Sequence, residues 1–353
     1  MARKPPTNRW PTARQSFLAA TSQFRGVPTV GPAPLIAPVH LDFGTASQTG
    51  RTLAFISSLR KRVLEKQERV AIDLSGCEYI GPIGMLLLAA EVERCNAIRP
   101  GNIWGSEPED ELAAFGLAAM GFHKAIGIDP PRELDIDSGF VQIVAGTADT
   151  EDVARKLAPV ADLALETWGD QRFANRVHGA LNEALTNVIM HAYDPAFPKA
   201  APASDGRWWI AGYADEGQAT FLALDHGVGI PVSAPLKNRG VQSYLSEFSS
   251  YTDEQVIFSV VADEGRSRTG LQNHGKGIPA MIALVKDLAE SGMVWIVSGQ
   301  GAYLLIKEAA KPPLPARIYG IPVKYAYPLA GTLIVWKVGR PIVGEQSEKP
   351  HDA

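Results

Sequence analysis

Two polar residues, Glu183 and Asn187, are four positions apart in a segment with helical periodicity, residues 171–192. That spacing puts them on one face of a helix, one turn apart. The side-chain oxygen of Asn is a suitable ligand for Mg²⁺, and a Glu carboxylate can polarise an attacking water or hydroxyl. The pair is consistent with a magnesium–phosphate site, although the same spacing is common on solvated helix surfaces.

A second candidate site begins where the apolar segment 219–224 ends. Asp225 follows it directly, and Gly227 and Gly229 come shortly afterwards, before Ile230. The carboxylate can accept a hydrogen bond from the exocyclic amine of a base, and the glycines let the backbone approach a flat ring. A tight turn with no ligand is the alternative interpretation.

A glycine-rich segment in front of a helical pattern is the third candidate. It contains Gly270, Gly275, Lys276 and Gly277. Free N–H groups at the start of a helix favour a phosphate chain. The spacing also matches the first part of a P-loop, but Gly277 stands where a P-loop has Ser or Thr, and the charged segment 263–269 precedes it instead of a buried strand. We therefore interpret the segment as a phosphate cradle of another kind.

In this order and with these gaps, the three segments resemble the N, G1 and G2 boxes of the GHKL family, the ATPases of gyrase, heat-shock chaperones and histidine kinases. The resemblance covers about residues 140–340, and Gly331-Thr332 resembles the late Gly-Thr element of the family. It implies that ATP and Mg²⁺ are the cofactors and that segment 232–269 is an ATP lid.

The resemblance also implies a role for each residue. Asn187 would ligate Mg²⁺, Glu183 would be the general base, and Asp225 would bind the adenine amine. The other residues would shape the base pocket or contact the phosphates: Gly227, Gly229, Ile230, Thr332, Gly275, Lys276 and Gly277. A solvated side chain is the alternative for the lysine in this set.

The segment His191-Ala192-Tyr193 resembles the end of the N box in the anti-sigma-factor serine kinases. An autophosphorylating histidine kinase would need an earlier dimerising helix pair that carries a phosphoacceptor histidine. His178 is the only histidine in segment 124–190, and it lies on the predicted N-box helix itself. The serine-kinase branch is therefore the better match.

The first part of the chain has a different resemblance. Segment 71–80, followed by Gly81-Pro82-Ile83-Gly84, resembles the centre of a STAS domain, the fold of the anti-sigma-factor antagonists, over about residues 38–128. Those antagonists carry a phosphorylatable serine in this segment, whereas Gly81 to Gly84 of this chain include no residue with a hydroxyl group. We expect this domain to dock a partner or to set the conformation of the ATPase, with a purely structural module as the alternative.

Composition narrows the classes of function. The net charge of −4 argues against a nucleic-acid binder that uses a large basic surface. Cys77 and Cys95 lack the spacing of a zinc site or a disulfide framework, which fits a reducing compartment. The longest apolar stretch, 79–90, is too short for a membrane span, and the N-terminus has no apolar signal core, so we expect a cytoplasmic protein.

The periodicities predict a fold class of α/β and α+β. Strands and helices alternate in a small α/β domain, 38–130, and a second domain, 138–342, is expected to be a sandwich with helices on one face of a mixed sheet. Segment 1–37 is interpreted as a disordered, basic and proline-rich tail and linker, and segment 343–353 as a disordered tail. The expected C-terminal elements are listed in order: a helix over 278–289, a hairpin over 293–307, a Pro-rich excursion over 311–322 and a last strand over 331–336.

These observations lead to one functional expectation and one alternative. The first is an ATP-binding regulatory protein that hydrolyses ATP or phosphorylates a partner protein on serine or threonine, with a homodimer left open. The alternative is a non-catalytic nucleotide-gated scaffold, or a subunit of a larger stress or defence assembly. The sequence alone does not separate ATPase, kinase and scaffold.

Overall fold

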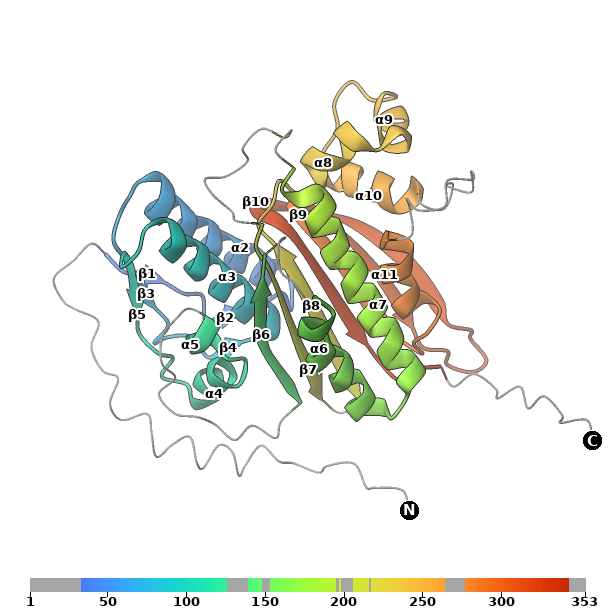
Figure 1. Cartoon of the computed structure of the whole chain (residues 1–353), viewed down its shortest axis with the longest axis horizontal. Helices are drawn as coiled ribbons and strands as arrows, with labels where there is room; N and C mark the ends of the chain where they lie inside the picture. Colours follow the sequence, from blue (N-terminus) through green and yellow to red (C-terminus); the bar gives the residue numbers. More distant parts are fainter. Residues whose placement is uncertain are drawn as a thin grey trace, which may run out of the picture.

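The computed structural model describes residues 33–125, 139–147, 153–194, 197, 206–215, 217–263 and 277–342. This part of the chain forms a first unit that ends at residue 125 and a second unit that begins at residue 139 (Figure 1). The expected tail 343–353, most of the tail 1–37, and the candidate residues Gly275 and Lys276 lie outside the described residues.

The first unit contains two small parallel sheets and the helices that cover them. The strands are β1 (Leu35–Ile36), β2 (His40–Leu41), β3 (Val70–Asp73), β4 (Tyr79–Ile80) and β5 (Ile103–Gly105). The sheets have the orders β1-β3-β5 and β2-β4, and every pair in them is parallel. The helices are α2 (Ala46–Arg60), its π-helical continuation η2 (Lys61–Glu65), α3 (Pro82–Ile98), α4 (Glu111–Ala119) and α5 (Phe122–Ala125). Strand β1 lies within the segment that the sequence led us to interpret as a linker.

The second unit is built on one five-stranded sheet of order β6-β7-β8-β10-β9. Its strands are β6 (Phe140–Gly146), β7 (Trp208–Asp215), β8 (Gln218–Asp225), β9 (Gly292–Glu308) and β10 (Arg317–Val338). Every neighbouring pair in this sheet is antiparallel. The α/β and α+β fold class is confirmed. The sheet of the second unit is not mixed as expected, because all its pairs are antiparallel and all the parallel pairs are in the first unit.

One face of the five-stranded sheet packs against helices of the second unit. These are α6 (Val153–Trp168), α7 (Gln171–Asn187) with its π-helical end η3 (Val188–Ala192), and α11 (Gly277–Lys286). Because side chains alternate along a strand, Phe221 and Ala223 of β8 point into this layer. The apolar residues of α6 and α7 recur with helical spacing on the side that faces the sheet, so burying them fixes both helices on this face.

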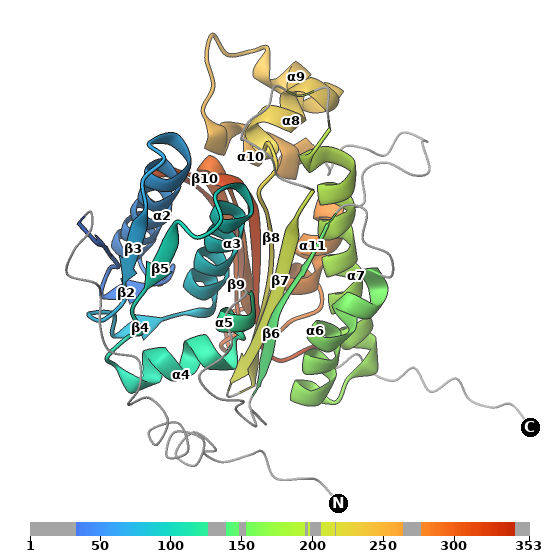
Figure 2. The same ribbon diagram turned by 60° about the vertical axis from the view of Figure 1, so that its left-hand side comes forward.

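The opposite face of the same sheet is covered by α2 and α3 of the first unit (Figure 2). Leu222 and Leu224, the alternate residues of β8, belong to the same hydrophobic core as the apolar residues of the first unit. Phe43 and Trp295 of β9 meet edge to face, with ring centroids 5.3 Å apart. One face of the sheet is therefore covered by helices of the second unit, as expected. The first unit covers the other face and forms a third layer that the sequence did not predict.

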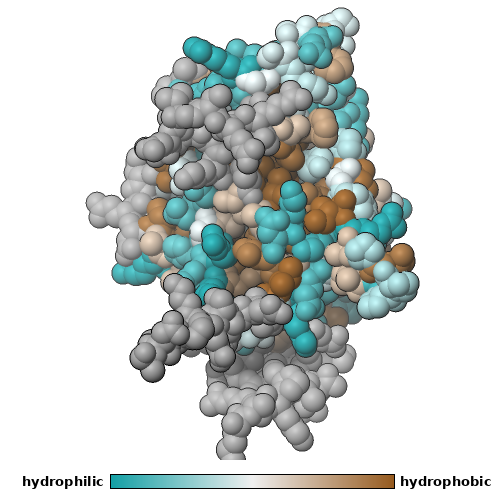
Figure 3. Space-filling model, turned by 90° about the vertical axis from the view of Figure 1, so that its right-hand side faces the viewer, coloured by the Kyte–Doolittle hydropathy of each residue, from teal (hydrophilic) through white to brown (hydrophobic). Residues whose placement is uncertain are grey.

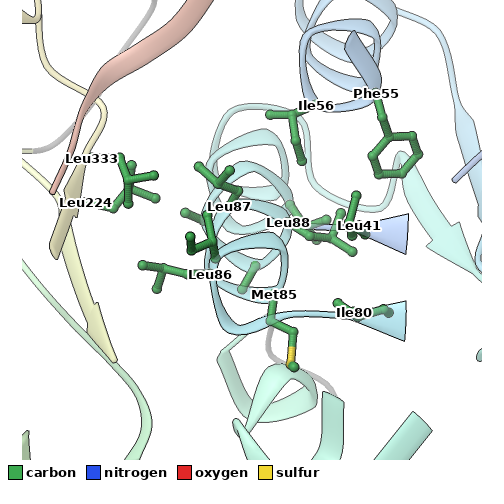
Figure 4. Packing of buried hydrophobic residues seen from close by; sticks show 14 of the residues in the cluster. Leu41, Phe55, Ile56, Ile80, Met85, Leu86, Leu87, Leu88, Leu224 and Leu333 are labelled. Carbon is green, nitrogen blue, oxygen red and sulfur yellow. The ribbon is translucent and has the colours of Figure 1, made fainter. Parts of the chain in front are cut away.

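Helix α3 contacts both the rest of the first unit and the sheet of the second unit. Its side chains are buried all round, which is typical of a helix enclosed on several sides. Figure 4 shows Leu86 and Leu87 directed towards Leu224 and Leu333 of the sheet, while Leu88 lies towards Leu41 of the first unit. The apolar run 83–90 therefore packs on two sides: some of its side chains contact the sheet of the second unit, and others contact the first unit.

Two strands are much longer than the sequence indicated. The expected hairpin over 293–307 is wrong, because this whole segment lies in β9, and the hairpin is formed by β9 and β10. Gly299 and Gly301 lie inside β9, where they allow α10 (Asp253–Asp263) to approach the strand. A Cβ on Gly299 would lie 2.3 Å from Oδ2 of Asp253, and one on Gly301 would lie 2.3 Å from the backbone N of Glu254. Glycine here marks a close approach instead of a reversal of the chain.

The segments that seemed irregular also contain regular structure. The expected Pro-rich excursion over 311–322 is wrong in its second half, because β10 already begins at Arg317. Segment 231–269 has weak periodicity, yet its described part forms α8 (Ile230–Lys237), α9 (Arg239–Leu245) and α10, which stand at one end of the sheet (Figure 1). Buried Val256, Ile257 and Val260 anchor α10 in the core.

Candidate functional site

Asp225 is the last residue of β8, and its carboxyl group is buried. The side chain is only 4% exposed, and its Oδ1 atom accepts a hydrogen bond of 2.7 Å from the backbone N–H of Gly227. Burial raises the pKa of Asp225 to about 7, against the opposing effect of the N–H groups of Gly227 and Thr332. Among the described residues no Lys or Arg pairs with this carboxyl group. Burying a carboxyl group that is hydrogen-bonded only by backbone donors costs free energy in the ligand-free protein. Its oxygens can still accept further hydrogen bonds.

Thr332 and Ser298 lie beside Asp225 on adjacent strands. Thr332 of β10 is paired with Asp225 on one side and with Ser298 of β9 on the other. The Oγ atom of Ser298 donates to the carbonyl of Gly331 at 2.7 Å and accepts from the backbone N–H of Ile230 at 3.0 Å. Ser298 therefore ties β9 and β10 to the start of α8. The sequence reasoning missed it, although a serine that ends the apolar run 293–297 was a visible signal.

Gly227 and Gly229 are required by contacts inside the protein. A Cβ on Gly227 would lie 2.4 Å from the carbonyl oxygen of Ala192, at the end of η3. Gly229 has a φ of +80°, and a Cβ there would lie 2.7 Å from Oγ of Ser298. The sequence predicts that both glycines leave the backbone open to a flat ring. The structure gives them another reason, the close packing of the turn after β8 on η3 and β9.

Glu183 and Asn187 lie on one face of α7, and both are half-buried. The end of this helical segment is bonded to the turn that follows β8, because the backbone N–H of Val228 donates to the carbonyl of Ala192 at 2.9 Å. Asn187 is the last residue of α7, and Ala192 is the last residue of η3, which continues it. The helical segment thus ends against the turn that follows Asp225, with Glu183 one turn further away than Asn187.

The third candidate segment is described only in part. Gly277 is the first residue of α11, and α11 packs beside α7. Helix α8 reaches the end of η3, where Nζ of Lys237 donates to the carbonyl of Met190 at 3.3 Å. Exposed apolar side chains lie at this junction: Ile189, Met190 and Leu236. On the face of the molecule that includes α7 and α11, hydrophobic residues gather near the centre (Figure 3).

His226 directly follows Asp225 and belongs to the interface with the first unit. Its ring lies 4.8 Å from that of Trp209, and its Nε2 atom lies 3.8 Å from Oε2 of Glu91 in α3. Burial lowers the pKa of His226 to about 3, in spite of the nearby Glu91 carboxylate. The ring is therefore neutral near pH 7, and its contact with Glu91 is longer than a hydrogen bond.

Glu91 is fully buried and is held by an arginine of the same unit. Its carboxylate receives hydrogen bonds from Nε and Nη2 of Arg60, the shortest of them 2.8 Å. Burial alone would raise the pKa of Glu91, but the charge and the hydrogen bonds of Arg60, together with other nearby positive charge such as that of Arg94, outweigh burial and lower the pKa to about 2. The interface between the units thus contains the buried ion pair of Arg60 and Glu91, and this pair lies close to His226, the residue after Asp225.

The residues present fit a nucleotide better than a metal held by the protein alone. In the described part of the chain, no three His, Cys, Asp or Glu side chains form a group that could hold a metal ion. The buried carboxyl of Asp225 suits an amine donor, and Asn187 offers one neutral oxygen to a cation that other ligands would have to share. Mg²⁺ would therefore depend on phosphate oxygens.

Comparison with known proteins gives no family for this chain. No protein-family model matches the sequence, and no curated protein matches it. Within the described ranges, none of the helices combines the length and the apolar character needed to cross a membrane.

Proposed function

We propose that this chain binds ATP with Mg²⁺ at the end of β8. The observation that carries the proposal is the carboxyl group of Asp225, which is buried, has no cation beside it among the described residues, and accepts hydrogen bonds only from backbone N–H groups. An exocyclic amine such as that of adenine would use the acceptor capacity that remains. The resemblance to the GHKL boxes supports the same ligand.

The proposed roles follow the position of each residue. Asp225 binds the adenine amine, and the turn with Gly227 and Gly229 shapes the base pocket together with Ile230. Thr332 lies next to Asp225 in register and completes this pocket. Gly275, Lys276 and Gly277 contact the phosphates at the start of α11, where free N–H groups favour negative charge.

Bound Mg²⁺ supplies charge that stabilises the phosphates, and Asn187 contributes one oxygen ligand to it. Glu183 stands one helical turn from Asn187 and takes the proton from the attacking water or from a hydroxyl of a partner protein. ATP hydrolysis and phosphorylation of a partner on serine or threonine need the same groups and differ in the acceptor.

The first unit is proposed to dock a protein partner, or a second copy of the chain, instead of receiving phosphate. The segment Gly81 to Gly84, where STAS-type antagonists carry serine, has no hydroxyl, and Gly81 lies close to Asp42: a Cβ on Gly81 would lie 2.2 Å from Cγ of Asp42. Burial raises the pKa of Asp42, and the backbone N–H of Gly84 donates to its carboxylate. The start of α3 is thus already occupied by an acid of this chain. We place the protein in the cytoplasm.

Calorimetry with Mg·ATP on the wild type, Asp225→Ala and Asn187→Ala tests the nucleotide site. We expect the wild type to bind, Asp225→Ala to lose binding, and Asn187→Ala to lose the magnesium-dependent part of it. No binding by the wild type at millimolar nucleotide would reject the proposal, and normal binding by Asp225→Ala would reject the base pocket.

Incubation with γ-labelled ATP separates the reactions. Free labelled phosphate indicates an ATPase, and a labelled partner indicates a kinase. Binding without either product leaves the nucleotide-gated scaffold. Glu183→Ala is expected to keep Mg·ATP binding and lose turnover, and unchanged turnover would remove Glu183 from the mechanism.

A further inference from the structure

The hydroxyl of Tyr193 bridges the ends of β7 and β8, and Tyr193 itself directly follows η3, the end of the α7 segment. It donates to the carbonyl of Arg207 at 2.5 Å and accepts from the backbone N–H of His226 at 2.9 Å. Trp208 and Asp225 are the last paired residues of β7 and β8, so Arg207 and His226 are the next residues on either side. The tyrosine hydroxyl takes the place of the next rung of the ladder.

Tyr193 also fixes the turn against the helix that carries Glu183 and Asn187. It directly follows Ala192, the last residue of η3, whose carbonyl accepts from the N–H of Val228. The two bonds together hold both sides of Gly227, which has no space for a side chain above η3. The geometry of Asp225 relative to the helix therefore depends on this contact.

The same chain of contacts continues into the first unit. The guanidinium of Arg207 pairs with Glu93 of α3, and Nε1 of Trp209 donates to the other oxygen of Glu93 at 2.5 Å. Glu93, Arg207, Tyr193 and the N–H of His226 thus form a continuous series from α3 to the residue after Asp225.

We infer that Tyr193 is a positioning residue for the proposed nucleotide site, and that Glu93 of the first unit acts on that site through Arg207 and Tyr193. The inference rests on the proposed function, because the site it positions is the one that we assign to ATP. Through these contacts the first unit affects the affinity for the nucleotide without contacting the nucleotide.

Tyr193→Phe tests the inference because it removes only the hydroxyl. Tyr213→Phe is the matched control: it lies on β7, and its hydroxyl donates to Asp215 at 2.9 Å on the exposed surface. We expect Tyr193→Phe to weaken Mg·ATP binding about tenfold, the equivalent of one well-placed hydrogen bond. Turnover at saturating ATP should change little, since Glu183 is untouched.

Amide hydrogen exchange of the full-length protein provides a measurement that needs no nucleotide. In Tyr193→Phe, the amides of His226 and Val228 should exchange about tenfold faster than in the wild type, while Tyr213→Phe leaves them unchanged. Wild-type exchange in Tyr193→Phe, or equal acceleration in both variants, would overturn the positioning role.

Glu93→Gln tests the connection to the first unit. It should weaken Mg·ATP binding in the wild-type background and have little further effect in Tyr193→Phe, because both changes act on one series of contacts. Fully additive losses would reject the connection. If the wild type binds no ATP, the proposed function fails, and hydrogen exchange still decides whether Tyr193 holds the turn.

Discussion

Asp225 and His226 are consecutive residues, but their side chains lie on opposite faces of the five-stranded sheet. The alternation along β8 directs Asp225 towards the layer of α7 and α11, as it does Ala223. His226 lies against Trp209 and Glu91, on the face covered by the first unit. One peptide bond therefore separates the proposed ligand site from the interface between the units, and burial shifts the pKa of both residues, upward for Asp225 and downward for His226.

Asp225 should make the free protein less stable as the pH rises. Its pKa is 3.8 in the unfolded chain and about 7 in the folded protein, so the folded state binds more protons in that window. The stability that this group contributes is fully present below pH 3.8 and is lost as the pH rises through about 7. Asp225→Asn abolishes the loss. Thermal unfolding should show the variant gaining on the wild type between pH 4 and pH 7, and a constant difference would contradict the buried, raised pKa.

His226 should act in the opposite direction. Its pKa is 6.5 when unfolded and about 3 when folded, so the unfolded state binds the extra proton in this window. The stability contributed by the neutral ring is present above pH 6.5 and is lost as the pH falls towards 3. His226→Gln should therefore gain on the wild type as the pH falls. NMR titration of the ring gives a direct check, and a ring that becomes protonated near pH 6 would refute the prediction.

The fold class and most helices and strands follow from local sequence patterns. Strand β8 could be predicted because an apolar run of strand length ends at a charged residue, and α7 because its apolar residues recur with helical spacing. The hairpin expected over 293–307 is one strand, β9, in which Gly299 and Gly301 contact another helix, and the local sequence does not reveal that tertiary contact.

The candidate site was only partly predictable, for a related reason. Asp225 was predicted from its place between an apolar strand and two glycines, Thr332 was predicted from the resemblance, and the register of β8 and β10 puts the two residues side by side. The roles of Ser298 and Tyr193 depend on hydrogen bonds to backbone groups that are distant in the sequence, and no local pattern encodes those partners. The docking of the first unit on the sheet is hidden in the same way, because a helix that is apolar all round does not reveal what encloses it.

Breaking the buried ion pair at the interface should be costly. Glu91→Gln removes the charge that compensates Arg60, while the arginine stays largely buried, with a side chain 17% exposed. Loss of one partner of a buried pair typically costs about 3–5 kcal/mol of the free energy of unfolding. Urea unfolding measures this change. The matched control is Glu68→Gln, which breaks the pair with Arg62 at a more accessible position. Equal effects of the two substitutions would show that burial of the first pair does not matter.

The packing of α3 can be tested with two helical glycines. A Cβ on Gly84 would lie 1.9 Å from the carbonyl oxygen of Leu41, a backbone atom that cannot move aside without displacing β2. Gly84→Ala should therefore destabilise the protein by about 3 kcal/mol or more, at the upper end of the usual range for single substitutions. Gly179 of α7 has nothing within 4 Å of its Cβ position, so Gly179→Ala should stabilise by about 0.5–1 kcal/mol through helix propensity. Urea unfolding compares the two variants with the wild type. A neutral Gly84→Ala would mean that the start of α3 does not rest on β2 inside the first unit.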